Sequence, residues 1–318
     1  MNTTPTTEDR IWAVISHLSS LAFGMGIVLP IIGWSDQRSK SNYASFQSLQ
    51  ALGYQSLGFT VWALSYLVII IATSIILLIM LGSRGGNSQN MDANLRPWMI
   101  VIFIVLLGFF ALYFLLPIVA AVACALGKDF RYPIMGDRLG RYLEYDPTQK
   151  SEGQTWLNED HEFRWVVAMG HFSILIMLWG MLAPLTTWIL YGKRNSFLEF
   201  QSIQTLVFQL ATTILYFGAV FPYLFGLFSL IALTRLTGEP NLNSPTAMFG
   251  VIVFGLSLLI TLVFALLMPF MHVVGQWAGY RVLKGGNYRY PLVGRLVDKW
   301  ISKKFPSRRN LHENIDRS

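Results

Sequence analysis

Six long stretches of the chain contain no Asp, Glu, Lys or Arg, and apolar side chains dominate each of them. They cover residues 11–35, 41–83, 97–127, 165–192, 200–234 and 240–280. A helix needs about 20 apolar residues to cross the hydrocarbon core of a bilayer, so each stretch is long enough. No stretch shows the period-two alternation of a barrel strand, and helices satisfy their own backbone inside lipid. The pattern predicts an all-α membrane protein with transmembrane helices near 11–34, 55–81, 98–126, 165–191, 206–233 and 247–280.

Composition supports a membrane protein over the alternative of a large soluble helical core. Charged residues make up 13% of the 318 residues, against about 25% in soluble domains. Runs such as 65–81 are apolar on every helical face, whereas a soluble helix keeps a polar face. The acidic pair Glu8 and Asp9 in the first ten residues is unlike a cleavable signal, so we expect the first helix to remain. The single cysteine, Cys124, excludes an intrachain disulfide framework and a zinc cluster of cysteines.

The most specific feature of the sequence is an internal duplication. Residues 10–55 and 164–209 are identical at thirteen of 46 positions without a gap, and most of the matches are rare residue types. The matches include His17 with His171, Pro30 with Pro184, Trp34 with Trp188, Gln47 with Gln201, and Gln50 with Gln204. Each copy closes on a second shared motif, Arg131-Tyr132-Pro133 in the first and Arg289-Tyr290-Pro291 in the second.

The duplication predicts the domain organisation. We expect a first three-helix repeat over 1–136, a polar linker over 137–163, a second repeat over 164–294 and a basic tail over 295–318. Three crossings in a repeat would make the second copy enter from the opposite side of the membrane. The two repeats would then be inverted, an arrangement that is common in transporters.

Charge is concentrated at one end of the chain. Residues 281–318 contain ten basic and three acidic side chains, a balance of +7, which equals the formal charge of the whole chain. With the predicted crossings, fifteen basic residues lie on the side of the termini and nine on the other. The positive-inside rule then predicts that both termini lie in the cytoplasm.

The tail reads as a basic amphipathic helix. Apolar residues recur at three and four after Pro291, and Arg295, Lys299, Lys303 and Lys304 fall between them, with Trp300 in the apolar row. Such a helix is expected to lie in the membrane interface and to bind anionic lipid. A solvated tail is the alternative. Nucleic-acid binding is not expected, because no recognition motif accompanies the basic residues.

Polar side chains inside the predicted helices are the candidate functional residues. They are His17, His171, Gln47, Gln50, Gln201, Gln204, His272 and Gln276. The glutamines of each pair are three residues apart and therefore share a helix face. They could join helices through hydrogen bonds or line a polar path. The histidines could act as a switch, a proton relay or a ligand contact, but a hydrogen bond to a neighbouring helix explains them as well.

The sequence predicts no cofactor and no catalysis. Haem ligation by His17 and His272 lacks any ligand-spacing motif. A metal at residues 160–162, Asp-His-Glu, is less well supported than a solvated helix start. No nucleophile-and-base pattern lies within the apolar stretches.

Several of these motifs carry a family resemblance. His-Leu-Ser at 17–19, Pro-x-x-x-Trp at 30–34, Phe-Gln at 46–47 and Phe-Arg-Tyr-Pro at 130–133 resemble a bacterial membrane domain of unknown function. That domain is similar to the Tic-type component of the chloroplast inner-envelope import translocon. The resemblance covers both repeats and implies a small multi-pass helical protein of a bacterial inner membrane, without known catalysis and able to associate with other membrane proteins.

Three functional hypotheses follow. The first is a non-enzymatic structural or assembly subunit, or a translocation-type component. The second is a small-solute transporter or channel with a polar path between inverted repeats. The third is a membrane-anchored lipid-surface binder that works through its tail, although it leaves the duplication unexplained.

Overall fold

The computed structural model describes residues 4–82, 91–147, 157–236 and 244–304, and within these ranges the secondary structure is helical throughout. Six helical segments are long and apolar enough to cross a membrane: Thr7–Gln37, Asn42–Ile76, Pro97–Ala125, Glu159–Tyr191, Ser196–Arg235 and Pro245–Leu283. The predictions of an all-helical membrane protein and of six candidate spans are confirmed.

The first and fourth candidate spans are each folded back on themselves. In the first repeat, α1 (Thr7–Leu18) leads into a 3₁₀ turn (Ser19–Ile27) and then α2 (Val28–Gln37). A straight helix of 31 residues would hold its ends about 45 Å apart. Instead, Gln37 Nε2 donates to Glu8 Oε1 at 3.1 Å, so α1 and α2 form a hairpin. The reversal occurs at Phe23, whose φ is 54°.

The second repeat has the same hairpin. α6 (Glu159–Phe172) is followed by a 3₁₀ turn (Ser173–Met181) and α7 (Leu182–Tyr191). Met177 reverses the chain with a φ of 53°, and Ser173 Oγ crosses the turn to donate to the Gly180 carbonyl at 2.9 Å. Each hairpin thus begins and ends at the same side of the molecule.

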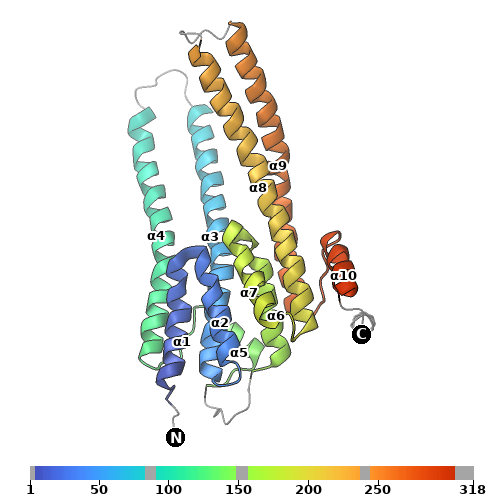
Figure 1. Ribbon diagram of the computed structural model, residues 1–318. Helices are drawn as coiled ribbons and strands as arrows, with labels where there is room; N and C mark the ends of the chain where they lie inside the picture. The colour runs from blue at the N-terminus through green and yellow to red at the C-terminus, as the bar shows by residue number, and fades with distance from the viewer. Residues whose placement is uncertain (1–3, 83–90, 148–156, 237–243, 305–318) are drawn as a thin grey trace.

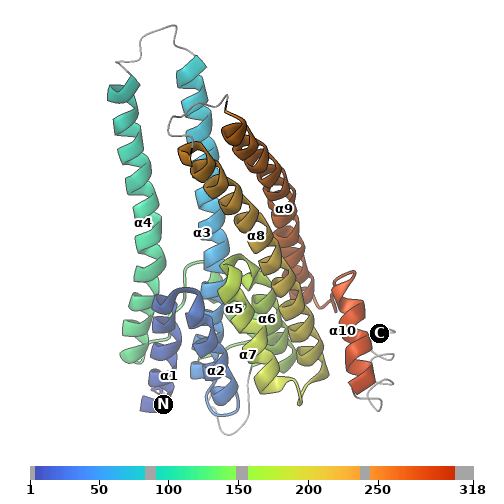
Figure 2. The ribbon, with the colours of Figure 1, turned by 45° about the horizontal axis from the view of Figure 1, so that its top comes forward.

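A pair of long antiparallel helices completes each repeat. The first repeat has α3 (Asn42–Gly82) and α4 (Met91–Ala125), and the second has α8 (Ser196–Leu236) and α9 (Pro245–Leu283). Both pairs extend well beyond the hairpin turns, in the same direction (Figures 1 and 2). Short helices follow each pair, α5 (Met135–Leu143) after α4 and α10 (Val293–Lys304) after α9.

The two repeats stand parallel, and the predicted inverted relation is wrong. A Cβ atom on Gly24 would lie 2.4 Å from Ile176 Cγ2, so the turns of the two hairpins touch. At the other end, the ring centroids of Trp34 in α2 and Tyr191 in α7 are 5.0 Å apart. The turn of one hairpin thus contacts the turn of the other, and the end of one contacts the end of the other. In an inverted pair, the turn of one hairpin would lie beside the end of the other. The prediction failed because each hairpin was counted as one crossing.

The long helices pack differently in the two repeats. α8 and α9 approach closely over small residues: a Cβ on Gly226 would lie 2.6 Å from Ser257 Cβ, and Thr261 Oγ1 donates to the Ala219 carbonyl at 3.0 Å. Small residues permit such close contact between helices in lipid. α3 and α4 stand further apart in both views and are bridged by long side chains (Figures 1 and 2). Tyr54 donates to the Tyr113 carbonyl at 3.0 Å.

The main core lies where the hairpins meet the lower halves of the long helices. It includes Trp34, Phe46, Leu49, Trp165 and Met169. Residues 42–54 form the buried lower part of α3. The proposed linker is described over 137–147 and 157–163, and tail residues 305–318 lie outside the described residues.

Candidate functional site

A fully buried histidine lies at the centre of each repeat. His17 is in the last turn of α1, whose start is fixed by a capping box between Thr6 and Asp9. His171 is in the last turn of α6, which Asn158 caps at the His161 amide. Both side chains are 0% exposed. The caps set the helix register that turns each histidine inward, toward the first half of the long helix that follows.

The partners of His17 fix the direction of its hydrogen bonds. Gln47 Nε2 lies 3.0 Å from the Phe130 carbonyl, which can only accept, so Gln47 Oε1 is the atom that faces His17 Nε2, at 3.0 Å. Because that oxygen can only accept, His17 Nε2 carries a proton. In the neutral ring Nδ1 is then the acceptor for the Tyr132 hydroxyl, 3.0 Å away.

Gln50 joins the histidine cluster to the chain that follows α4. Its Nε2 donates to the Phe130 carbonyl at 2.9 Å and to Gln47 Oε1 at 3.1 Å. Its Oε1 accepts from the Tyr132 backbone amide at 2.8 Å. All polar atoms of the amide are therefore used, and the Arg-Tyr-Pro motif is held against α3 by its backbone as well as by its tyrosine.

The second repeat reproduces the arrangement bond for bond. His171 meets Tyr290 at 2.9 Å through Nδ1 and Gln201 at 3.2 Å through Nε2. Gln204 donates to Gln201 Oε1 at 2.6 Å and to the Tyr288 carbonyl at 2.7 Å, and it accepts from the Tyr290 amide at 3.2 Å. We call these two clusters the polar clamps: His17, Gln47, Gln50 and Tyr132 in the first repeat, and His171, Gln201, Gln204 and Tyr290 in the second.

A third glutamine in each long helix holds the hairpin turn. Gln55 Nε2 donates to Ser19 Oγ at 2.8 Å, and Gln209 Nε2 donates to the Gly170 carbonyl at 2.8 Å. The turns lack regular helical bonds at these points, so the side chains supply partners for buried polar groups.

Glycine is required where the closing motif approaches the clamp. A Cβ on Gly136 would lie 2.5 Å from Gln50 Oε1 and 2.7 Å from Arg131 Cβ. Its counterpart Gly294 has a looser environment, with Gln204 Oε1 at 3.4 Å. The two glycines stand at the same distance from the Arg-Tyr-Pro motif in the sequence, but the contact that explains them depends on the fold.

The clamp of the first repeat ends on a carboxylate, whereas the second ends on an amide. Gln47 Nε2 donates to Asp129 Oδ1 at 2.9 Å, and Gln201 Nε2 donates to Asn287 Oδ1 at 2.6 Å. Burial raises the pKa of Asp129, and the nearby Arg131 guanidinium opposes that shift. Arg131 also pairs with Asp137 at 3.0 Å, and Arg289 pairs with Asp298 at the same distance.

A buried ion pair joins the two repeats and was missed by the sequence analysis. Glu162, 0% exposed, accepts from Arg38 at 3.1 Å, from Trp34 Nε1 at 3.1 Å and from Ser45 Oγ at 3.2 Å. The Arg38 guanidinium also lies 4.4 Å from the centroid of the Phe163 ring. The sequence suggested a solvated helix start at 160–162. Only the packing of α6 against α2 and α3 buries this carboxylate.

The structure brings no metal site together. Among the described residues, no group of three or more His, Cys, Asp or Glu side chains is placed to hold an ion. His161 is stacked on Tyr142, with ring centroids 4.4 Å apart, and its Nδ1 lies 2.6 Å from the Tyr142 carbonyl. His17 and His272 belong to different repeats and have separate partners, so they do not form a haem pair.

His272 and Gln276 lie apart from the clamps, on α9. His272 Nε2 contacts the Tyr216 hydroxyl of α8, and Gln276 Nε2 donates to the Phe172 carbonyl at 3.1 Å. Gln276 therefore joins α9 to the hairpin of its own repeat. These contacts have no counterparts in the first repeat, where Trp62 and Phe114 occupy the positions of Tyr216 and His272.

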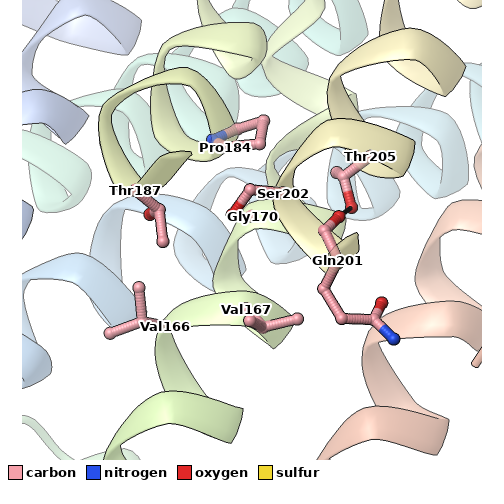
Figure 3. Close-up of a pocket in the computed structure, with 8 residues that line it drawn as sticks. All are labelled: Val166, Val167, Gly170, Pro184, Thr187, Gln201, Ser202 and Thr205. Carbon is pink, nitrogen blue, oxygen red and sulfur yellow. Dashed lines mark hydrogen bonds between the residues drawn. The ribbon is translucent and has the colours of Figure 1, made fainter. Parts of the chain in front are cut away.

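A narrow crevice lies beside the second clamp. Figure 3 shows it between α6, α7 and α8, with the Gln201 amide turned away from it. The space among Gly170, Thr187, Ser202 and Thr205 is too small to admit a water molecule. In the first repeat, Ser16 occupies the place of Gly170 and hydrogen-bonds Ser48 at 3.0 Å. The clamp glutamines Gln47, Gln50, Gln201 and Gln204 are buried and hydrogen-bond to other buried side chains and to backbone.

The predicted lipid-binding residues lie on α10. Arg295, Lys299, Trp300 and Lys303 are exposed, whereas the side chain of Lys304 lies outside the described residues. The proline of each closing motif stands just before a short helix. The exposed Ile134 lies between Pro133 and α5, and the exposed Leu292 lies between Pro291 and α10.

Comparison with known protein families gives one result. Residues 8–139 and residues 162–297 each match the model of a family described as the magnetosome magnetite crystal formation protein family, MamF/MmsF. The two matches repeat the internal duplication. They overturn the predicted membership of a Tic-like import family, whose resemblance rested on short motifs that build the clamps. No curated protein and no solved structure matches the chain.

Proposed function

The chain belongs to the magnetosome magnetite crystal formation protein family, and from this premise we propose that it is a non-enzymatic, structural component of a magnetosome membrane. It would contribute to crystal formation by organising that membrane or its proteins, not by catalysis. One observation carries the proposal: the polar side chains buried in each repeat bond to one another and to backbone. Groups committed in this way stabilise a scaffold and are not available to a substrate.

The same observation counts against the transporter hypothesis. A polar path would need Gln47, Gln50, Gln201 and Gln204 to face a wet cavity, and all four are 0% exposed. Each donates to a backbone carbonyl just before the closing motif of its own repeat, that of Phe130 in the first and that of Tyr288 in the second. The parallel relation of the repeats also removes the inverted symmetry on which that hypothesis was built.

We infer the orientation from the charges at the two ends of the long helices. One end of the molecule holds the start of α1 and the loops after α2, α4, α7 and α9 (Figure 1). Most of the described basic residues lie at this end: Arg10, Arg38, Lys40, Lys128, Arg131, Arg138, Arg141, Arg164, Lys193, Arg194, Arg281, Lys284, Arg289, Arg295, Lys299 and Lys303. Within the described ranges, only Arg96 and Arg235 lie near the opposite end. The positive-inside rule supports a cytoplasmic location for the basic end.

Deletion and complementation in the host test the proposal. We expect loss of the chain to change the number or size of magnetite crystals seen by electron microscopy, and the wild-type chain to restore them. A variant that weakens one clamp should restore them in proportion to the amount of folded protein in the membrane. Unchanged crystals after complete deletion would refute the role. Flux of a small solute through vesicles that contain only this protein would favour transport instead.

A further inference from the structure

Helix α10 has two apolar rows, of which the protein covers only one. Val297 and Ile301 are buried against Phe200 and Ile203 of α8. The second row is formed by Leu296 and Trp300 of the helix and by Leu292, the residue just before it, and these side chains are 63%, 45% and 76% exposed. Residues four apart share a helix face, so the three side chains form one continuous strip. A strip of large apolar side chains on the surface marks a site of contact with another apolar phase.

A basic edge runs beside the exposed row. Arg295, Lys299 and Lys303 each follow a member of the row by three residues, and all three are exposed. Among the described residues, the ion pairs of this helix involve Asp298, which faces Arg289 at 3.0 Å, and not these three cations. The face therefore combines an apolar strip with uncompensated positive charge, a combination that fits an anionic lipid surface.

The first repeat shows that this face is not needed to build the fold. Its counterpart α5 has Ile134, Arg138 and Tyr142 at the positions of Leu292, Leu296 and Trp300. Tyr142 is taken up by stacking on His161 of α6. Helix α10 lies at the outer flank of α8 (Figure 1), where Leu292, Leu296 and Trp300 are exposed. The exposed apolar row with its basic edge is thus a feature of α10 and not of α5.

The level of α10 suits a membrane interface. It lies beside the lower part of α8, toward the end of the molecule that contains the charged loops (Figures 1 and 2). We propose that the row Leu292, Leu296 and Trp300, with its basic edge, is a docking surface for the anionic leaflet at this end of the protein.

Fluorescence quenching in vesicles tests the surface. Full-length protein with Leu296→Cys in a Cys124→Ala background carries a small fluorophore, and the lipids carry a nitroxide near the headgroup. One set of vesicles contains phosphatidylcholine alone, and the other contains equal parts of phosphatidylcholine and phosphatidylglycerol. We expect strong quenching in the anionic vesicles, weak quenching in the neutral ones, and loss of the difference at high salt.

A charge variant and a matched control complete the test. Each basic residue removed should weaken docking about five-fold, so Arg295→Gln, Lys299→Gln and Lys303→Gln together should weaken it roughly a hundred-fold. The control places the fluorophore at Ile134→Cys, just before α5. There, the anionic and the neutral vesicles should quench the fluorophore equally. Equal quenching of the α10 label in both lipids, a signal insensitive to the triple variant, or a water-exposed label in anionic vesicles would each overturn the proposal. None of these results bears on magnetite formation, so this proposal and the proposed function can fail separately.

Discussion

Replacement of the central glutamine of a clamp should destabilise its repeat strongly. Gln50→Leu removes two donated bonds, to the Phe130 carbonyl and to Gln47 Oε1, and one accepted bond from the Tyr132 amide. The Phe130 carbonyl keeps its bond from Gln47, and Gln47 Oε1 keeps its bond from His17. The Tyr132 amide is the group left buried without a partner.

The expected cost follows from this inventory. An orphaned buried amide costs about 1–3 kcal/mol, and each of the other two lost bonds contributes about 0.5–1.5 kcal/mol. The total is about 2–6 kcal/mol. For a chain of this size, a loss at the lower end of that range shifts the melting temperature by roughly 4–8 °C.

The duplication supplies a replicate, and α9 supplies a control. Gln204→Leu orphans the Tyr290 amide in the same way and should cost about as much. Gln276→Leu removes the side-chain bond to the Phe172 carbonyl and should cost about 0.5–1.5 kcal/mol. Tryptophan fluorescence during heating in detergent or nanodiscs measures the three variants. If Gln50→Leu melts within a degree of Gln276→Leu, the clamp is hydrated or dispensable and the reasoning fails.

Three further predictions concern single residues. Asp129→Asn should change stability little at pH 7, since the second repeat has an amide at this place. Because the folded pKa of Asp129 is raised, the contribution of this side chain to the free energy of unfolding falls as pH rises from the ordinary pKa of 3.8 through the raised one. Melting temperatures measured against pH should show this fall in the wild type and not in the variant. Gly136→Ala should destabilise the protein, because the new Cβ would lie only 2.5 Å from Gln50 Oε1. Gly170→Ala has its nearest neighbour at 3.9 Å and should stabilise its helix by about 0.5–1 kcal/mol. Chemical denaturation should therefore shift the midpoints of the two variants in opposite directions. Glu162→Gln should cost about 2 kcal/mol by weakening the bond from Arg38, and equal stability of variant and wild type would show that the repeats do not depend on this pair.

The sequence predicted the helical class and the polar residues that matter, but not how the chain crosses the membrane. Length and apolarity identify 11–35 and 165–192 correctly as membrane-seeking segments. They cannot reveal that Phe23 and Met177 adopt a positive φ and reverse the chain, because neither residue type favours that conformation. One missed reversal in each repeat turned a parallel pair into a predicted inverted pair.

The burial of Glu162 could not be read from the sequence for a different reason. Its neighbours Asp160 and His161 are exposed or half-buried, as expected at a capped helix start. What buries Glu162 is the contact of α6 with α2 and α3, which are more than a hundred residues away along the chain. Local patterning contains no signal for such a contact.

The two copies agree in the residues of the polar clamps and differ where the repeats meet. The clamps have the same His, Gln and Tyr residues in both copies and the same pattern of hydrogen bonds between them. At the seam, Arg38 has Gly192 as its counterpart and Ser45 has Glu199. Among the described residues, α1 and α8 make no contact as extensive as that of α6 with α3. Each clamp acts within one repeat, so both copies need the same residues, whereas the seam is formed once and each copy supplies a different half of it. Fusion of the copies in one chain keeps those unlike halves in a fixed order, which two identical separate chains could not do.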